Sequence, residues 1–145
     1  MKSKLLLDEG EKVYVVVLET GEEVVSLLME FALEKQLTAS QITGIGALRE
    51  VTLGHFNLEK RDYKRIPLKE QVEVLSLVGN IATDKNQPRI HAHIVVGRSD
   101  GSAFGGHLIE AYVRPTLEVI IQETPEHLWR KTDPATGLAL IDLDR

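Results

Sequence analysis

Three of the five histidines lie close together in the sequence, in a pattern that suits metal binding. His91 and His93 are separated by one residue, and His107 follows a Gly-Gly pair. In a β-strand, side chains two residues apart point to the same face, so His91 and His93 would lie side by side. A third imidazole returning after a turn at Ser99–Gly101 would complete three nitrogen ligands, which suits Zn²⁺ with an open fourth position. The pattern predicts a divalent transition metal on His91, His93 and His107, with zinc as the first choice.

Two alternatives stay open for this cluster. The three imidazoles could be structural residues, each with its own hydrogen bond. Imidazole ligands alone also do not separate Zn²⁺ from Ni²⁺, Cu²⁺ or Fe²⁺. His55 and His127 have no comparable neighbours, so we expect them to be structural or surface residues. Because the chain contains no cysteine, any metal must be held by His, Asp or Glu.

Glu73 and Glu118 are weak candidates for a catalytic base. A metal with an open position lowers the pKa of bound water toward ~7, and hydrolysis then needs a nearby carboxylate. Each glutamate stands between apolar residues of a predicted strand. The alternative is that both face solvent, since antiparallel sheets often keep one polar face. The motifs of serine nucleophiles and phosphate-binding loops are absent, so an enzymatic function rests on the metal alone.

The elements that must position these residues are one helix and several strands. After a buried strand at Val13–Leu18, Thr20 and Glu23 form a capping-box pattern, and apolar residues then recur at helical spacing to about Leu37. A terminal hairpin is expected within residues 124–145. The predicted fold class is α+β, with one main helix packed on a largely antiparallel sheet. The other strand patterns cover Glu50–Leu58, Tyr63–Leu68, Val72–Ile81, Ile90–Val96 and Thr116–Ile121.

Composition and charge limit the partners. With 145 residues, 43% of them hydrophobic and 27% charged, the chain is expected to form a single domain over residues 1–145. The apolar run that ends at Leu7 is too short for a secretory signal, so we expect a cytoplasmic protein without membrane association. A net charge of −5 disfavours non-specific nucleic-acid binding. The basic residues of 60–65 are interspersed with acidic ones, a pattern typical of a solvated hairpin.

A series of short motifs follows in order along the chain: Gly44-Ile45-Gly46-Ala47, Glu73-Val74-Leu75-Ser76-Leu77, Gly79, His91-Ala92-His93, Gly101, Gly105-Gly106-His107-Leu108 and Glu118-Val119-Ile120. With these motifs, the chain from Gly21 to Glu123 resembles the PPC (plants and prokaryotes conserved) domain, with a core match over about 12–123. The resemblance implies an α+β domain that associates as a homotrimer, whose stand-alone prokaryotic members are candidate DNA-binding proteins. Plant relatives carry an AT-hook of the Arg-Gly-Arg-Pro type, and no Arg-Gly-Arg occurs in this sequence.

Two functions follow as expectations. The first is a homotrimeric regulatory or interaction module with a three-histidine metal site, in which DNA contact is weak, indirect or made through protein partners. The second is a metal-dependent enzyme that acts on a small polar molecule at a subunit interface. The two differ in whether a catalytic carboxylate lies near the open metal position.

Overall fold

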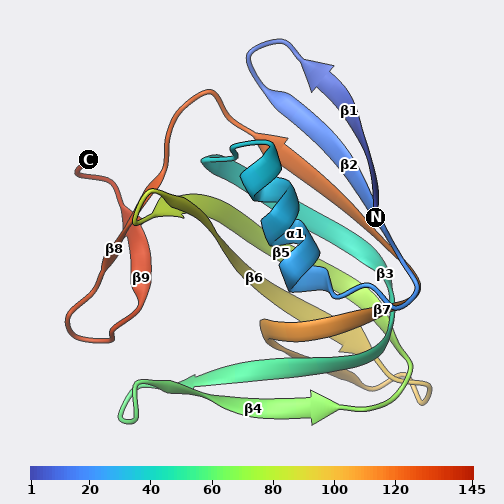
Figure 1. Cartoon of the computed structure of the whole chain (residues 1–145). Coiled ribbons are helices and arrows are strands. Elements are labelled where there is room, and N and C mark those ends of the chain that lie inside the picture. Colours follow the sequence, from blue (N-terminus) through green and yellow to red (C-terminus); the bar gives the residue numbers. More distant parts are fainter.

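The computed structural model describes residues 1–145, and most of the chain lies in one sheet (Figure 1). The fold is mainly β with one short helix of 11 residues, so the expected α+β class with a main helix overstates the helix. The elements are β1 (Lys2–Asp8), β2 (Lys12–Glu19), α1 (Val24–Glu34), β3 (Ala39–Asn57), β4 (Asp62–Leu68), β5 (Val72–Asp84), β6 (Gln87–Gly97), β7 (Ala103–Glu123), β8 (Trp129–Thr132) and β9 (Ala139–Asp142).

Two long strands, β3 and β7, hold the sheet together. β7 pairs with β6 near its start and with β2 near its end, and β3 runs antiparallel to most of its length. β3 also pairs with β5 at its beginning and with β4 at its end. Because β5 pairs in turn with β6, the strands β3, β5, β6 and β7 close into a ring of hydrogen-bonded neighbours. This closure brings β6 against the first residues of β7.

The close contact between β3 and β7 depends on glycine. A side chain at Gly46 would overlap the backbone of Thr116 and Leu117, and the pairing of β3 with β5 shifts register between Gly44 and Gly46. The absence of a side chain at Gly46 therefore lets the two strands approach closely.

The helix is capped by Glu23 rather than by Thr20. The Glu23 carboxylate accepts hydrogen bonds from the backbone amides of Val25 (3.1 Å) and Ser26 (2.7 Å), and from that of Ala111 in β7 (3.1 Å). The Thr20 hydroxyl instead donates to the Pro115 carbonyl (3.1 Å). The predicted capping box was therefore wrong, because the glutamate caps the helix itself while tying it to the sheet.

The helix also ends earlier than its apolar pattern predicts. It stops at Glu34, and Gln36 adopts a positive φ of 54° that turns the chain. Leu37 continues the helical spacing, but it reaches the core from the loop after the helix and is 2% exposed. Leu37 therefore continues the apolar spacing of the helix without being part of it.

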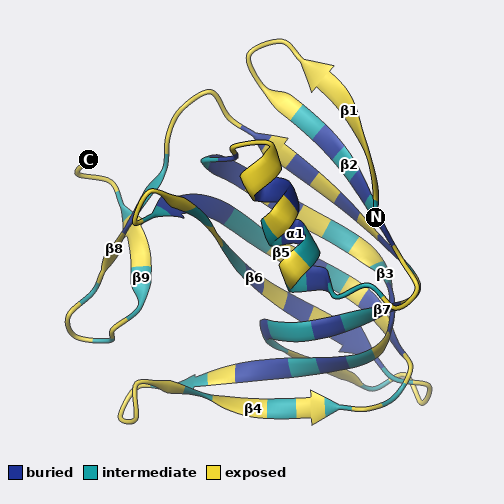
Figure 2. Cartoon of the chain, viewed as in Figure 1, coloured by how far each residue is buried: buried dark blue, intermediate teal, exposed yellow.

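The hydrophobic core lies between α1 and one face of the sheet (Figure 2). The helix buries Val24, Leu28, Phe31 and Ala32 against it, and Tyr14 of β2 packs edge-on to Phe31 with ring centroids 5.3 Å apart. The opposite face is exposed yet carries large apolar side chains. We call this surface the apolar sheet face; it comprises Ile45, Leu75, Val78, Val95 and Ile120.

The C-terminal hairpin forms as expected. β8 and β9 pair antiparallel from Trp129 to Asp142, and β8 also meets the end of β5 through one parallel pairing, Thr83 with Trp129. None of the helical residues forms a segment long and apolar enough to cross a membrane.

Candidate metal centre

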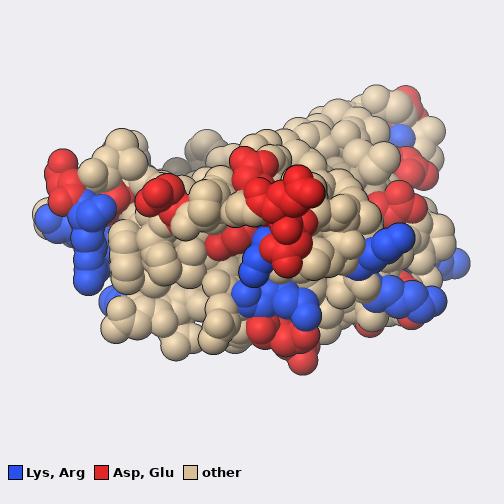
Figure 3. All heavy atoms as spheres, turned by 90° about the horizontal axis from the view of Figure 1, so that it is seen from above, with Lys and Arg blue, Asp and Glu red and all other residues tan.

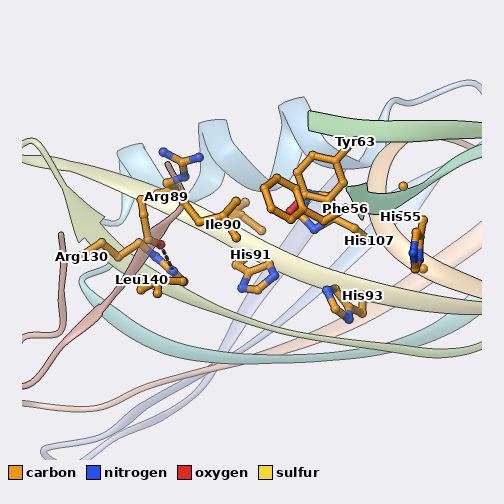
Figure 4. Close-up of a pocket in the computed structure, with 14 residues that line it drawn as sticks. His55, Phe56, Tyr63, Arg89, Ile90, His91, His93, His107, Arg130 and Leu140 are labelled. Carbon is orange, nitrogen blue, oxygen red and sulfur yellow. Dashed lines mark hydrogen bonds between the residues drawn. The ribbon is translucent and has the colours of Figure 1, made fainter. Parts of the chain in front are cut away.

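The three histidines meet where β6 pairs with the start of β7 (Figure 4). His93 lies directly opposite His107, and His91 is two residues earlier on the same face of β6. Ala92 points to the core and is 4% exposed. One ligand nitrogen from each ring can be chosen so that all three lie within 4.8 Å of one another. The structure thus brings the three histidines together, and metal binding by them stays a prediction.

Neighbouring rings hold His107 in the cluster. Its ring centroid lies 5.4 Å from that of His91 and 5.7 Å from that of His93. On its other side, Tyr63 of β4 stacks on it at 4.4 Å with an angle of 23°. A side chain at Gly106 would come within 2.7 Å of the Gly54 carbonyl, so the glycine before His107 lets β7 approach β3 closely at this point.

The electrostatics favour neutral rings. Burial lowers the pKa of His107 to about 4, and burial followed by the charge of His93 also lowers the pKa of His91. Neutral imidazole is the form that binds metal. The Nδ1 atom of His107 is buried and has no hydrogen-bond partner, which is unfavourable for a polar atom. A metal ion bound at Nδ1 would satisfy this atom, and three converging imidazole nitrogens are a donor set that suits a divalent transition metal.

A cleft of about 420 Å³ opens over the histidines, within the size range of small-molecule sites. His55 is an exposed residue that lines the wall of this cleft and lies outside the group of three. Apolar and cationic side chains form most of the remaining wall. They include Phe56, Tyr63, Arg89, Ile90, Arg130 and Leu140 (Figure 4).

Glu73 and Glu118 lie away from this cleft. Glu73 is opposite Gly97, four residues beyond His93, which is about 13 Å along the strand at ~3.3 Å per residue. Glu118 is opposite Ile45 of β3, so β3 and β5 separate it from β6 by about 14 Å at ~4.8 Å per strand. Both are exposed, and no carboxylate of the chain lines the cleft. Neither glutamate is placed to act as a base on a ligand bound at the histidines of the same chain.

Sequence reasoning missed Tyr63 and Arg130. Tyr63 reaches His107 because the β3–β4 hairpin folds over the start of β7, and its position in an alternating strand carries no sign of this. Arg130 enters the cleft because β8 crosses to β5 at a single pairing. Neither long-range contact has a local sequence signal.

Comparison with known proteins agrees with this architecture. Residues 7–125 match the Plants and Prokaryotes Conserved (PCC) domain, the same family as PPC. This chain belongs to that family. The PCC chain is 33% identical to a candidate DNA-binding protein of known structure from Bacteroides thetaiotaomicron, with 99% of each chain covered and a TM-score of 0.88.

Two further solved structures resemble this PCC chain over nearly its whole length. A PPC protein from Pyrococcus horikoshii is 34% identical, with 99% of this chain and 96% of the other covered and a TM-score of 0.85. A protein from Archaeoglobus fulgidus described as metal-containing is also 34% identical, with 97% and 99% covered and a TM-score of 0.82.

The curated relatives are much longer proteins. The bifunctional protein GlmU of Synechococcus sp. (strain JA-3-3Ab) is 28% identical over 137 residues, which is 92% of this chain and 21% of that protein. The chain therefore spans about a fifth of the length of the curated relatives it matches.

Proposed function

We propose that this PCC-family protein is a regulatory or interaction module in which His91, His93 and His107 hold one divalent metal, with zinc as the first choice. The observation that carries the proposal is the convergence of three imidazole ligand atoms within 4.8 Å in a cleft. The buried, unpartnered Nδ1 of His107 and the metal-containing relative support it. When bound, the metal would supply a Lewis-acidic open position to a ligand in the cleft.

The proposal includes assembly as a homotrimer. Ile45, Leu75 and Val78 of the apolar sheet face are 61%, 55% and 51% exposed, and contiguous apolar surface of this kind marks interaction sites. Val78 lies directly opposite His93, so a second chain packed on this face would reach the edge of the histidine cluster. The resemblance to the PPC domain supports three copies.

DNA contact, in this proposal, is weak or made through protein partners. A structural relative is described as a candidate DNA-binding protein, and the net charge of this chain is −5. On the face seen in Figure 3, basic side chains lie beside acidic ones and form no continuous basic surface. Such a surface would be needed to neutralise a row of phosphates.

A metal-dependent enzyme acting on a small polar molecule is the second candidate. The cleft volume of about 420 Å³ favours it, because the space suits a small molecule beside the histidines. Hydrolysis at this site would need a general base from another subunit, since neither Glu73 nor Glu118 lines the cleft.

The metal content of purified protein tests the proposal. After dialysis against Zn²⁺ and removal of unbound metal, elemental analysis should find about one equivalent per chain, and anomalous scattering should locate it between the histidines. His93→Ala should lose most of the metal. His127→Ala is the matched control, because His127 stacks on Trp129 away from the cluster. Less than about a tenth of an equivalent in the unchanged protein, or equal losses in both variants, contradicts the site.

A further inference from the structure

Arg130 is a buried cation without an acidic partner. The residue is 7% exposed, and it forms no ion pair with any Asp or Glu. The guanidinium donates to two neutral acceptors, the Ala139 carbonyl (2.7 Å) and the Asn80 side-chain oxygen, while its Nε is buried and unpaired. Burial, followed by the charge of Arg89, lowers the pKa of Arg130. An anion reaching this group would therefore gain more than it would at a surface arginine.

The acids and bases around Arg130 do not offset its charge. Asp84 is the carboxylate whose charge acts on Arg130, and it already pairs with Arg89 at 2.7 Å. A guanidinium has five N–H donors, and Arg130 uses two of them in the hydrogen bonds to Ala139 and Asn80. Of the three donors left, Nε–H is buried, and the second N–H of each terminal nitrogen remains for a carboxylate or phosphate, the groups that an arginine fork recognises best.

Arg130 and the histidines face the same cleft. Asn80, which accepts from Arg130, is the direct cross-strand partner of His91. Figure 4 shows Arg130 at one end of the cleft, with His91 and then His93 further along it. A divalent cation held by the three histidines would add positive charge beside the guanidinium, so both ends of this space favour a negatively charged ligand.

The rest of the cleft wall suits an apolar ligand body. Phe56, Tyr63, Ile90 and Leu140 line the same space, whose volume of about 420 Å³ holds a small organic molecule. The wall therefore combines one buried cation with aromatic and aliphatic surface.

We infer that the cleft binds a small organic anion, whose carboxylate or phosphate group is held by Arg130 beside the histidine cluster while its apolar part contacts Phe56, Tyr63 and Leu140. The inference rests on the proposed function and deepens it, since it names the class of ligand that the histidine site would take. Arg130 is a binding residue in this scheme.

Calorimetric titration of zinc-loaded protein tests this inference with three probes that share one aromatic ring: benzoate, phenyl phosphate and neutral benzamide. At least one of the anions should bind ten times more tightly than benzamide, and the tighter anion identifies carboxylate or phosphate as the preferred group. Arg130→Gln should weaken anion binding by roughly ten- to a hundredfold, the effect of losing hydrogen bonds to a charged group. Its zinc content should stay near one equivalent.

Lys131→Gln is the matched control, because it removes the same charge from the next residue of β8, where the side chain is exposed. It should leave anion affinity within about twofold. If both anions bind no better than benzamide, or if Arg130→Gln binds them as the unchanged protein does, the inference is wrong. If Arg130→Gln does not fold, Arg130→Lys keeps the charge without the planar fork and should weaken binding less.

Soaking a crystal of the unchanged protein with the anion that binds more tightly tests the inference without a variant. An anion oxygen within ~3.2 Å of an Arg130 nitrogen is expected, and a probe bound away from Arg130 overturns the inference.

Failure of the metal site gives a different result. In that case the protein holds no zinc, and loss of anion binding in metal-free Arg130→Gln would still support the role of Arg130.

Discussion

At the scale of single residues, Tyr63 orients His107, a candidate metal ligand, by ring stacking and without a hydrogen bond. Its ring stacks on His107 at 4.4 Å, while the rings of His91 and His93 lie 5.4 and 5.7 Å from the same imidazole. Burial raises the pKa of Tyr63, so its hydroxyl stays neutral and adds no charge near the cluster. His107 is thus held between an aromatic face and two other imidazoles, and the stack limits its rotation.

Replacing Tyr63 should loosen this arrangement without removing a ligand. We expect Tyr63→Ala to lower zinc affinity by about two- to tenfold, since an aromatic stack is worth ~0.5–1.5 kcal/mol. Tyr63→Phe keeps the ring and should restore the affinity. Competition against a chromogenic chelator measures both. Equal affinities for the alanine and phenylalanine variants would show that the stack does not position His107.

At the scale of elements, the site depends on how α1 and β7 are fixed to each other. Glu23 caps the helix and also accepts from the Ala111 amide, so one carboxylate joins the helix start to the middle of β7. Ala111 lies four residues after His107 on this strand. The cap therefore contributes to the placement of the strand that carries the third histidine.

The two candidate cap residues should respond very differently to substitution. Glu23→Ala should lower the free energy of unfolding by about 1–2 kcal/mol, because it leaves amides of the first helical turn and of Ala111 without their acceptor. Thr20→Ala should cost less than ~0.5 kcal/mol, since Thr20 is exposed and bonds only to the Pro115 carbonyl. Urea denaturation followed by circular dichroism measures both. If Thr20→Ala lowers the free energy of unfolding more than Glu23→Ala does, Thr20 caps the helix as the capping-box pattern predicts.

At the scale of the whole molecule, the two faces of the sheet have different roles. One face is covered by α1 and forms the core, whereas the other exposes the apolar sheet face next to the histidines. On the face seen in Figure 3, charged side chains lie in small groups of both signs, and the net charge of the chain is −5. The molecule therefore offers an apolar surface to another protein chain more readily than a basic surface to nucleic acid.

The proposed trimer can be tested with one charge on that face. We expect the unchanged protein to sediment at three times the 16.2 kDa chain mass, and Ile45→Asp to sediment as a monomer because a carboxylate would be buried in the interface. Leu33→Asp is the control, since Leu33 is 46% exposed on the helix and lies outside the apolar sheet face. A monomeric unchanged protein at micromolar concentration contradicts the trimer.

DNA binding is the second prediction for the whole molecule. In a fluorescence titration at about 150 mM salt, we expect a Kd no tighter than ~10⁻⁶ M that weakens further as salt increases, as for non-specific contacts. The reason is the net charge of −5 and the absence of an Arg-Gly-Arg motif. Nanomolar binding that depends on the DNA sequence would contradict this prediction.

The sequence by itself determined the features that depend on local periodicity. The two-residue repeat of a strand put His91 and His93 on one face with Ala92 on the other, and apolar spacing located α1 and much of the sheet, but not β1 or the first halves of β3 and β7. These features follow from backbone geometry, which neighbouring residues share. The sequence also contained the family resemblance that the match over residues 7–125 confirms.

Only the tertiary structure decided which distant side chains share the cleft. His107 meets His93 because the ring of β3, β5, β6 and β7 closes, Arg130 arrives through the single crossing of β8 to β5, and Glu73 and Glu118 stay outside. Tyr63 reaches His107 from β4, which pairs with β3, and the Glu23 carboxylate that caps the helix also accepts from Ala111 of β7. Strand pairing across the chain depends on how all the strands bury their apolar faces together, and no local pattern in the sequence encodes that choice.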